Sequence, residues 1–269
     1  STIAIAVIGY MVWAHHMFTS GMSDTARTVF SFLTFFVAIP TGVKVFNWVA
    51  TLWRGTIVLS SPMLMALSAI FLFSIGGLTG LHLGAISTDI HLHDTYFVIA
   101  HFHYVIIGGI LSMFIAAMHY WFPKMFGKMH NEKVAKVGVV LYFIGANVLY
   151  FPMFIMGYMG MPRRYFDYLP EFQIYHVIST IGSWILITSI LLMFINLLIA
   201  IVKGKKVGPN PWGAKTLEWT MPSPPPLLNF IETPIPNEDP YDYNNHDERK
   251  FINGQFTDEN ENENIQENS

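Results

Sequence analysis

The stretch "HDTYFVIAHFHYV", residues 93–105, opens a long apolar run that nevertheless carries His101 and His103. The run extends from Thr95 to Phe122. Spanning a bilayer as a helix takes about 20 apolar residues, so this segment is long enough to cross a membrane. Polar side chains inside a bilayer are costly and usually mark function. The segment therefore predicts a transmembrane helix with two functional imidazoles.

The rest of the chain repeats this apolar pattern. Hydrophobic residues make up 52% of the 269 residues and charged residues only 12%, whereas about a quarter is usual for soluble proteins. Further spans are predicted at Thr25–Trp53, Thr56–Leu83, Val134–Met159 and Ile174–Val202, with a partial span at Thr2–Trp13. None of these runs has a polar stripe wide enough to face water. We expect an all-α, polytopic transmembrane bundle of about five full spans plus a partial N-terminal span.

Composition also narrows the chemistry. The chain has no cysteine, which excludes disulfides, thiolate metal sites and cysteine nucleophiles. Lysine and arginine lie between the apolar runs rather than along one face, so we expect no nucleic-acid partner. The chain does not begin with Met, and no basic segment of a signal peptide precedes "STIAIAVIGYMVW". We expect a piece of a longer protein or a processed product.

Basic residues concentrate in the connections at 53–56 and 123–136 and in the segment 202–206. Because positive connections face the cytoplasm or the mitochondrial matrix, these three are predicted on that side. Arg163 and Arg164 lie on the opposite side, which suggests that they have a partner. His130 lies in a basic connection and is expected to be solvated.

Three segments are predicted along the chain. Residues 1–206 form the transmembrane domain, and residues 207–236 form a polar, Pro-rich extension on the cytoplasmic or matrix side. Residues 237–269 form an Asn/Glu-rich acidic tail. Such a composition cannot bury a core, so the tail is predicted to be disordered.

The two histidines of the opening stretch cannot share one ion. On a helix they are about 200° apart, so each must serve its own partner. Imidazole is a common axial ligand of haem iron, which suggests two haems on opposite flanks of one helix. The alternative is a pair of core histidines that donate to backbone carbonyls. Arg163 and Arg164 would then hold haem propionates, unless they are an exposed basic pair.

His15 and His16 are adjacent at the outer end of the partial span. On a regular helix neighbours diverge by about 100°, but in a turn both rings can reach one ion. A site made only of histidine suits copper, zinc or iron.

Two more polar groups lie at or near spans. Lys44 lies inside the second apolar run with Thr41 one turn away, which suggests a hydrated proton path or a lysine that reaches the membrane surface. His93 and Asp94 precede the span of the opening stretch. They suggest a hard-cation site, or a carboxylate favoured at a helix N-terminus.

Five motifs in order resemble one known family: "VWAHHMF", "IPTGVKVF", "HDTYFVIAHFHYV", "GMPRRYFDY" and "LEWTMPSPPP". From about Ile5 to Phe230 the chain resembles the C-terminal half of subunit one of cytochrome c oxidase, in the haem–copper oxidase superfamily. The resemblance implies a twelve-helix catalytic subunit, of which this chain holds the end of helix seven and helices eight to twelve.

The resemblance implies a role for each candidate residue. His15 and His16 would be two of three ligands of the active-site copper, while His101 would bind the high-spin haem and His103 the low-spin haem. Lys44 and Thr41 would belong to the proton channel that the family names after its lysine. His93 and Asp94 would contribute to a magnesium or manganese site at the border with subunit two. Arg163 and Arg164 would bind haem propionates.

The implied activity is reduction of O₂ to water with electrons from cytochrome c, coupled to proton translocation in a bacterial or mitochondrial inner membrane. The haems would be of the haem A type. Expected partners are the N-terminal half of the same subunit, which would hold the third copper ligand, and oxidase subunits two and three. A quinol oxidase of the same superfamily, or a non-catalytic membrane subunit that keeps the histidines, is the alternative.

Overall fold

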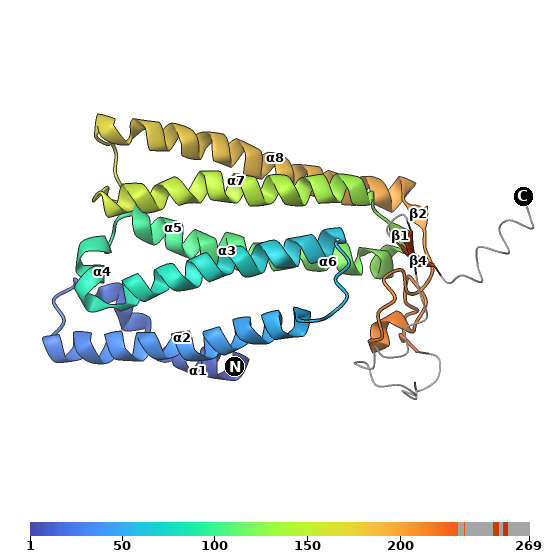
Figure 1. The fold of residues 1–269 in the computed structure, drawn as a ribbon, viewed down its shortest axis with the longest axis horizontal. Coiled ribbons are helices and arrows are strands. Elements are labelled where there is room, and N and C mark those ends of the chain that lie inside the picture. Colours follow the sequence, from blue (N-terminus) through green and yellow to red (C-terminus); the bar gives the residue numbers. More distant parts are fainter. Residues whose placement is uncertain (231–233, 235–249, 253–254, 258–269) are drawn as a thin grey trace, which may run out of the picture. The chain divides into compact units, whose positions relative to one another are not determined.

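Long helices dominate the chain in the computed structural model, which describes residues 1–230, 234, 250–252 and 255–257 (Figure 1). The α-helices are α1 (Thr2–Met11), α2 (Asp24–Leu52), α3 (Ser61–Gly84), α4 (Ile86–Leu92), α5 (Tyr96–Val105), α6 (Ser112–Phe126), α7 (Glu132–Tyr158) and α8 (Gln173–Lys203). Short antiparallel strand pairs join β1 (Lys128–Met129) to β2 (Lys205–Lys206) and β3 (Lys250–Ile252) to β4 (Gln255–Thr257).

The predicted spans are confirmed within the described residues. Five helical segments are long and apolar enough to cross a membrane, and Tyr96–Phe126 forms one of them. The partial span ends at Met11, followed by a 3₁₀ turn at Trp13–Met17. α3 begins at Ser61, five residues later than predicted, because a proline at its second position and a carboxylate cap favour a start there.

The faces of these helices are unusually apolar. Large side chains such as Phe46, Phe71, Trp184 and Leu198 are exposed in the chain. In α2 only 6% of the most apolar window is buried. Apolar surface on this scale is typical of helices that contact lipid or partner helices.

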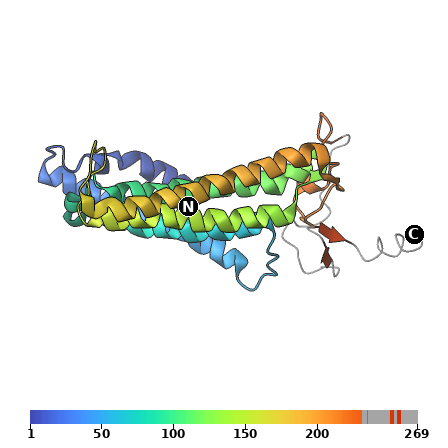
Figure 2. The ribbon, with the colours of Figure 1, turned by 90° about the horizontal axis from the view of Figure 1, so that it is seen from above.

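The chain divides into two compact units. The first contains residues 1–59, 63–114 and 139–189. In it α7 and α8 lie side by side (Figures 1 and 2). A Cβ atom on Gly145 would lie 2.6 Å from the backbone nitrogen of Leu186, and one on Gly182 would meet the backbone of Leu149. Glycine at these positions lets the two backbones approach closely.

Glycines also bring α3 against α5. A Cβ atom on Gly76 would lie 2.9 Å from Cγ2 of Val105, and Gly108 would clash with Leu72 in the same way. Residues Ile106–Leu111 form a π-helical turn between α5 and α6. Such turns recur near functional sites, and here the turn directly follows the helix that carries His101 and His103.

The second unit contains residues 60–62, 115–138 and 190–269. In it Nζ of Lys124 donates to the carbonyls of Pro209 at 2.9 Å and Met221 at 2.6 Å. Trp212 donates from Nε1 to the carbonyl of Tyr120 at 2.7 Å. The described part of the predicted extension therefore packs on α6. The predicted tail, residues 237–269, lies outside the described residues apart from β3 and β4.

Candidate functional site

His101 faces α3. Its Nδ1 lies 2.9 Å from the carbonyl oxygen of Gly76, so Nδ1 carries the hydrogen and donates it. A Cβ atom on Gly80 would lie 2.9 Å from Cε1 of the His101 ring, so glycine leaves room for the imidazole. Within the described residues Nε2 of His101 makes no hydrogen bond. The ring therefore has one oriented nitrogen and one nitrogen available as a ligand.

His103 faces α7. Its Nδ1 donates to the carbonyl of Ile99 at 2.7 Å. The ring stacks on Tyr150, with 4.5 Å between ring centroids and 14° between ring planes. The two rings thus contact different helices, as their spacing on one helix predicts.

The two imidazoles fit haem iron. Metal-binding histidines commonly donate their second ring N–H to a carbonyl or carboxylate, which sets the tautomer and the ring orientation. Both His101 and His103 show this arrangement. The alternative of two core histidines accounts for the Nδ1 atoms but leaves both Nε2 atoms without a role.

His15 and His16 lie in the 3₁₀ turn after α1, with 4.3 Å between their ring centroids. Nδ1 of His15 lies 3.3 Å from Oγ1 of Thr34 on α2. His15 and His16 each interact electrostatically with His101. No group of three or more His, Cys, Asp or Glu side chains in the described part of the chain is arranged to hold a metal ion. A metal ion bound by this pair would therefore need further ligands.

His93 pairs with a residue that the sequence analysis missed. Its Nδ1 lies 2.9 Å from Oδ2 of Asp89, one turn earlier on α4. Asp89 is 3% exposed, and burial raises its pKa while the hydrogen bond from His93 opposes that shift. Thr95, not Asp94, caps α5, since its Oγ1 accepts from the backbone N–H of Phe97. Asp94 directly precedes this cap, so it lies outside the first turn of α5.

The arginine pair meets Asp94. Nε of Arg163 lies 3.7 Å and Nη1 of Arg164 4.0 Å from Oδ1 of Asp94. The backbone N–H of Arg163 also donates to the Asp94 carbonyl at 2.8 Å. Because each guanidinium carries five N–H donors, the pair can still bind a further carboxylate.

Thr41 and Lys44 lie one turn apart on α2. The Thr41 hydroxyl donates to the Val37 carbonyl at 2.7 Å, and Nζ of Lys44 lies 6.0 Å from the centre of the Trp48 ring. No hydrogen bond joins Thr41 to Lys44 within the described residues.

Comparison with known proteins places the chain in a family. Residues 1–185 match the profile described as "Cytochrome C and Quinol oxidase polypeptide I". The chain belongs to the cytochrome c and quinol oxidase polypeptide I family. As a member with five apolar helices, it is a multi-pass membrane protein of a bacterial or mitochondrial inner membrane.

Curated relatives in this oxidase family carry the name cytochrome c oxidase subunit 1. The chain is 46% identical over 238 residues to the Bacillus sp. (strain PS3) protein, covering 87% of this chain and 39% of the relative. It is 47% identical over 243 residues to the Thermostichus vulcanus protein, covering 90% and 44%. The chain thus spans less than half the length of these relatives.

A solved structure shares the fold of this oxidase-family chain. It is a chain of a heme-copper terminal oxidase dimer, determined by cryo-EM, with a TM-score of 0.66. At 22% identity the match covers 73% of this chain and 40% of the other, so it supports the fold alone.

Several residues that contact the candidate site were not identified from the sequence. Asp89 had a signal, its four-residue spacing to His93 on one helix face. Thr34, Gly80 and Tyr150 had none, because their roles depend on which helices pack together.

Proposed function

We propose that this chain is the C-terminal half of the catalytic subunit of a respiratory terminal oxidase. The complex reduces O₂ to water with electrons from cytochrome c and couples this to proton translocation. The family and the relatives named cytochrome c oxidase subunit 1 support the proposal. The observation that carries it is α5, which offers Nε2 of His101 and of His103 toward different flanks.

His101 holds the high-spin haem and His103 the low-spin haem, both of the haem A type. His15 and His16 are two of the ligands of the active-site copper. When bound, these groups supply electron transfer and the reduction of dioxygen. The chain's own contribution is orientation, since the carbonyls of Gly76 and Ile99 keep the proton on Nδ1 and leave each Nε2 lone pair for iron.

Protons reach the site through α2. Lys44, half-buried on an otherwise apolar helix, holds a proton at Nζ and passes it to water. The Thr41 hydroxyl, one turn away, offers an oxygen that a water molecule can donate to while its own hydrogen bonds to Val37.

Two polar groups complete the outer part of the site. His93 and Asp94, with Asp89 behind His93, bind magnesium or manganese, because carboxylate oxygen is a preferred ligand of these hard cations. Arg163 and Arg164 hold haem propionates while Asp94 fixes their position.

The chain acts in a complex. The N-terminal half of the subunit would supply a further ligand to the copper and one to the low-spin haem, and subunits two and three would complete the oxidase. The relatives favour cytochrome c as the donor over quinol, although the family description includes both.

Purification of the oxidase that contains this chain tests the proposal. Reduced-minus-oxidised spectra should show two haems per complex, and oxygen uptake should be fast with reduced cytochrome c and slow with quinol. The reverse donor preference would support the quinol oxidase. An intact complex without haem absorbance would support a non-catalytic membrane subunit instead.

A further inference from the structure

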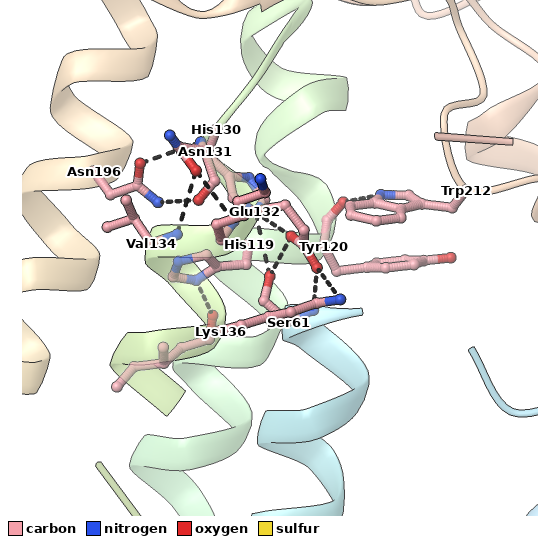
Figure 3. A network of polar contacts seen from close by, with 12 residues as sticks. Ser61, His119, Tyr120, His130, Asn131, Glu132, Val134, Lys136, Asn196 and Trp212 are labelled. Atoms are coloured by element: carbon pink, nitrogen blue, oxygen red, sulfur yellow. Dashed lines mark hydrogen bonds and ion pairs between the residues drawn. The ribbon is translucent and has the colours of Figure 1, made fainter. Parts of the chain in front are cut away.

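Two buried imidazoles meet in the second unit, apart from all the residues assigned above. His119 lies on α6 and His130 in the connection before α7, and they are 3% and 4% exposed. Their ring centroids are 4.9 Å apart with an interplanar angle of 87°. Figure 3 shows them beside Glu132 and Ser61. The prediction of a solvated His130 is therefore wrong.

One nitrogen of each ring is held by a partner. Nδ1 of His119 donates to the carbonyl of Ile115 at 2.9 Å. Nε2 of His130 lies 3.2 Å from Oε2 of Glu132. That carboxylate also accepts from the Ser61 backbone N–H at 2.5 Å and from its hydroxyl at 2.7 Å. Because the Glu132 carboxylate contacts the N-terminus of α3 at Ser61, its anionic form is stabilised. Nε2 of His130, which faces this anion, therefore carries the hydrogen.

The other two nitrogens are then hydrogen-bond acceptors. Nε2 of His119 and Nδ1 of His130 are both buried, and neither has a hydrogen-bond partner within the described residues. Unpaired buried acceptors are unfavourable, so a pair of them in one cluster points to a bound species.

The arrangement matches metal-binding histidines, whose second N–H typically donates to a carbonyl or a carboxylate. Two imidazoles on one tetrahedral zinc ion, with Zn–N of about 2.1 Å, have ring centroids about 5 Å apart. The observed spacing of 4.9 Å is compatible with this value and also with an edge-to-face contact of the two rings. We propose that Nε2 of His119 and Nδ1 of His130 bind one divalent transition-metal ion of the zinc class.

Water would complete the coordination. A cavity of about 320 Å³ reaches the His130 side of the pair, where Asn131 and Asn196 also line it. The two asparagines bond each other, since Nδ2 of Asn196 donates to the Asn131 carbonyl at 2.9 Å and the Asn131 N–H donates back at 3.2 Å. This exchange keeps the wall of the cavity polar on the His130 side.

The charge and the ligand type favour zinc over a hard cation. Imidazole nitrogen suits zinc, copper, iron and nickel, whereas magnesium and calcium prefer oxygen ligands. The Glu132 carboxylate, bonded to His130, offsets part of the positive charge of the ion and of the nearby Lys136, whose Nζ lies 3.9 Å from Oε1. The ion would cross-link α6 to the connection before α7.

The test uses the intact oxidase complex. It is treated with a chelator, incubated with Zn²⁺, desalted and analysed for bound zinc, as wild type and as the variants His119→Gln and His130→Gln. His82→Gln is the control, because His82 is an exposed histidine on α3. Wild type and control should retain one zinc ion more per complex than either variant, whose affinity should fall by roughly 10–100-fold or more. Unchanged haem spectra show that each variant is assembled.

Equal zinc in wild type and both assembled variants would overturn the proposal and leave water as the bridge. If a variant fails to assemble, zinc K-edge absorption on the loaded wild type decides. Scattering from two imidazole nitrogens in the additional ion supports the site, and an oxygen-only shell contradicts it.

Discussion

His101 and His103 lie two residues apart on α5, and their rings contact different helices, α3 and α7. Each ring donates from Nδ1 to a backbone carbonyl. The acceptor for His101 is the carbonyl of Gly76 on α3, whereas the acceptor for His103 is the carbonyl of Ile99 on α5 itself. The position of His101 therefore depends on how α3 packs, whereas His103 is oriented by its own helix and by the stack on Tyr150.

Removing the imidazole of His101 should affect the high-spin haem, and removing that of His103 should affect the low-spin haem. His101→Ala is expected to abolish oxygen reduction while the low-spin haem remains, because His101 is the proposed ligand of the high-spin haem alone. His103→Ala should remove the low-spin spectrum. Optical spectra and oxygen uptake of the purified complex measure both effects. Retained turnover in His101→Ala would refute its assignment.

Gly80→Ala should displace the His101 ring. The added Cβ would lie 2.9 Å from Cε1. A shift of about 1 Å at a reacting group can cost on the order of 10²-fold in rate, so oxygen uptake should fall steeply. Gly77→Ala is the matched control on the same helix, since its Cβ would meet nothing within 4 Å. Equal rates in both variants would contradict the role of Gly80.

Lys44→Met should slow proton delivery, because methionine cannot carry a proton at that position of α2. Loss of a proton-transfer group costs typically on the order of 10²-fold or more in turnover. Oxygen uptake by the purified complex measures this, and both haem spectra should stay unchanged. The control is Lys133→Met, an exposed lysine on α7. Full turnover in Lys44→Met would show that protons take another route.

Asp89→Asn should weaken the hard-cation site. The neutral amide of asparagine cannot offer His93 the charged oxygen that Asp89 does. Loss of a carboxylate that orients a metal-binding histidine typically costs roughly 10–100-fold in metal affinity. Manganese titration followed by electron paramagnetic resonance measures the change. Asp24→Asn serves as control, because the Asp24 carboxylate is 98% exposed at the start of α2. An unchanged affinity in Asp89→Asn would remove Asp89 from the site.

Much of the membrane architecture could be predicted because its causes are local. A span needs a minimum length of apolar residues, and five such runs were readable without knowing what they contact. The start of α3 was misplaced because its cap, Glu132, comes from a residue 71 positions away. The π-helical turn at Ile106–Leu111 was not predicted; within it, Gly108 packs closely against Leu72 of α3.

The candidate site was predicted in part for the same reason. The opposite directions of His101 and His103 follow from helix geometry, and His15 and His16 are consecutive residues in the sequence. Their electrostatic interaction with His101 was not, because it joins residues more than 80 positions apart in the chain.

By itself, the sequence determined the number of spans, the two flanks of α5 and the family motifs, because helical periodicity and bilayer thickness act on neighbouring residues. Only the tertiary structure decided which carbonyl orients His101, that Arg163 meets Asp94, and that His119 and His130 share a buried space. The physical reason is that these contacts join residues far apart in the chain, and close packing of helices selects them.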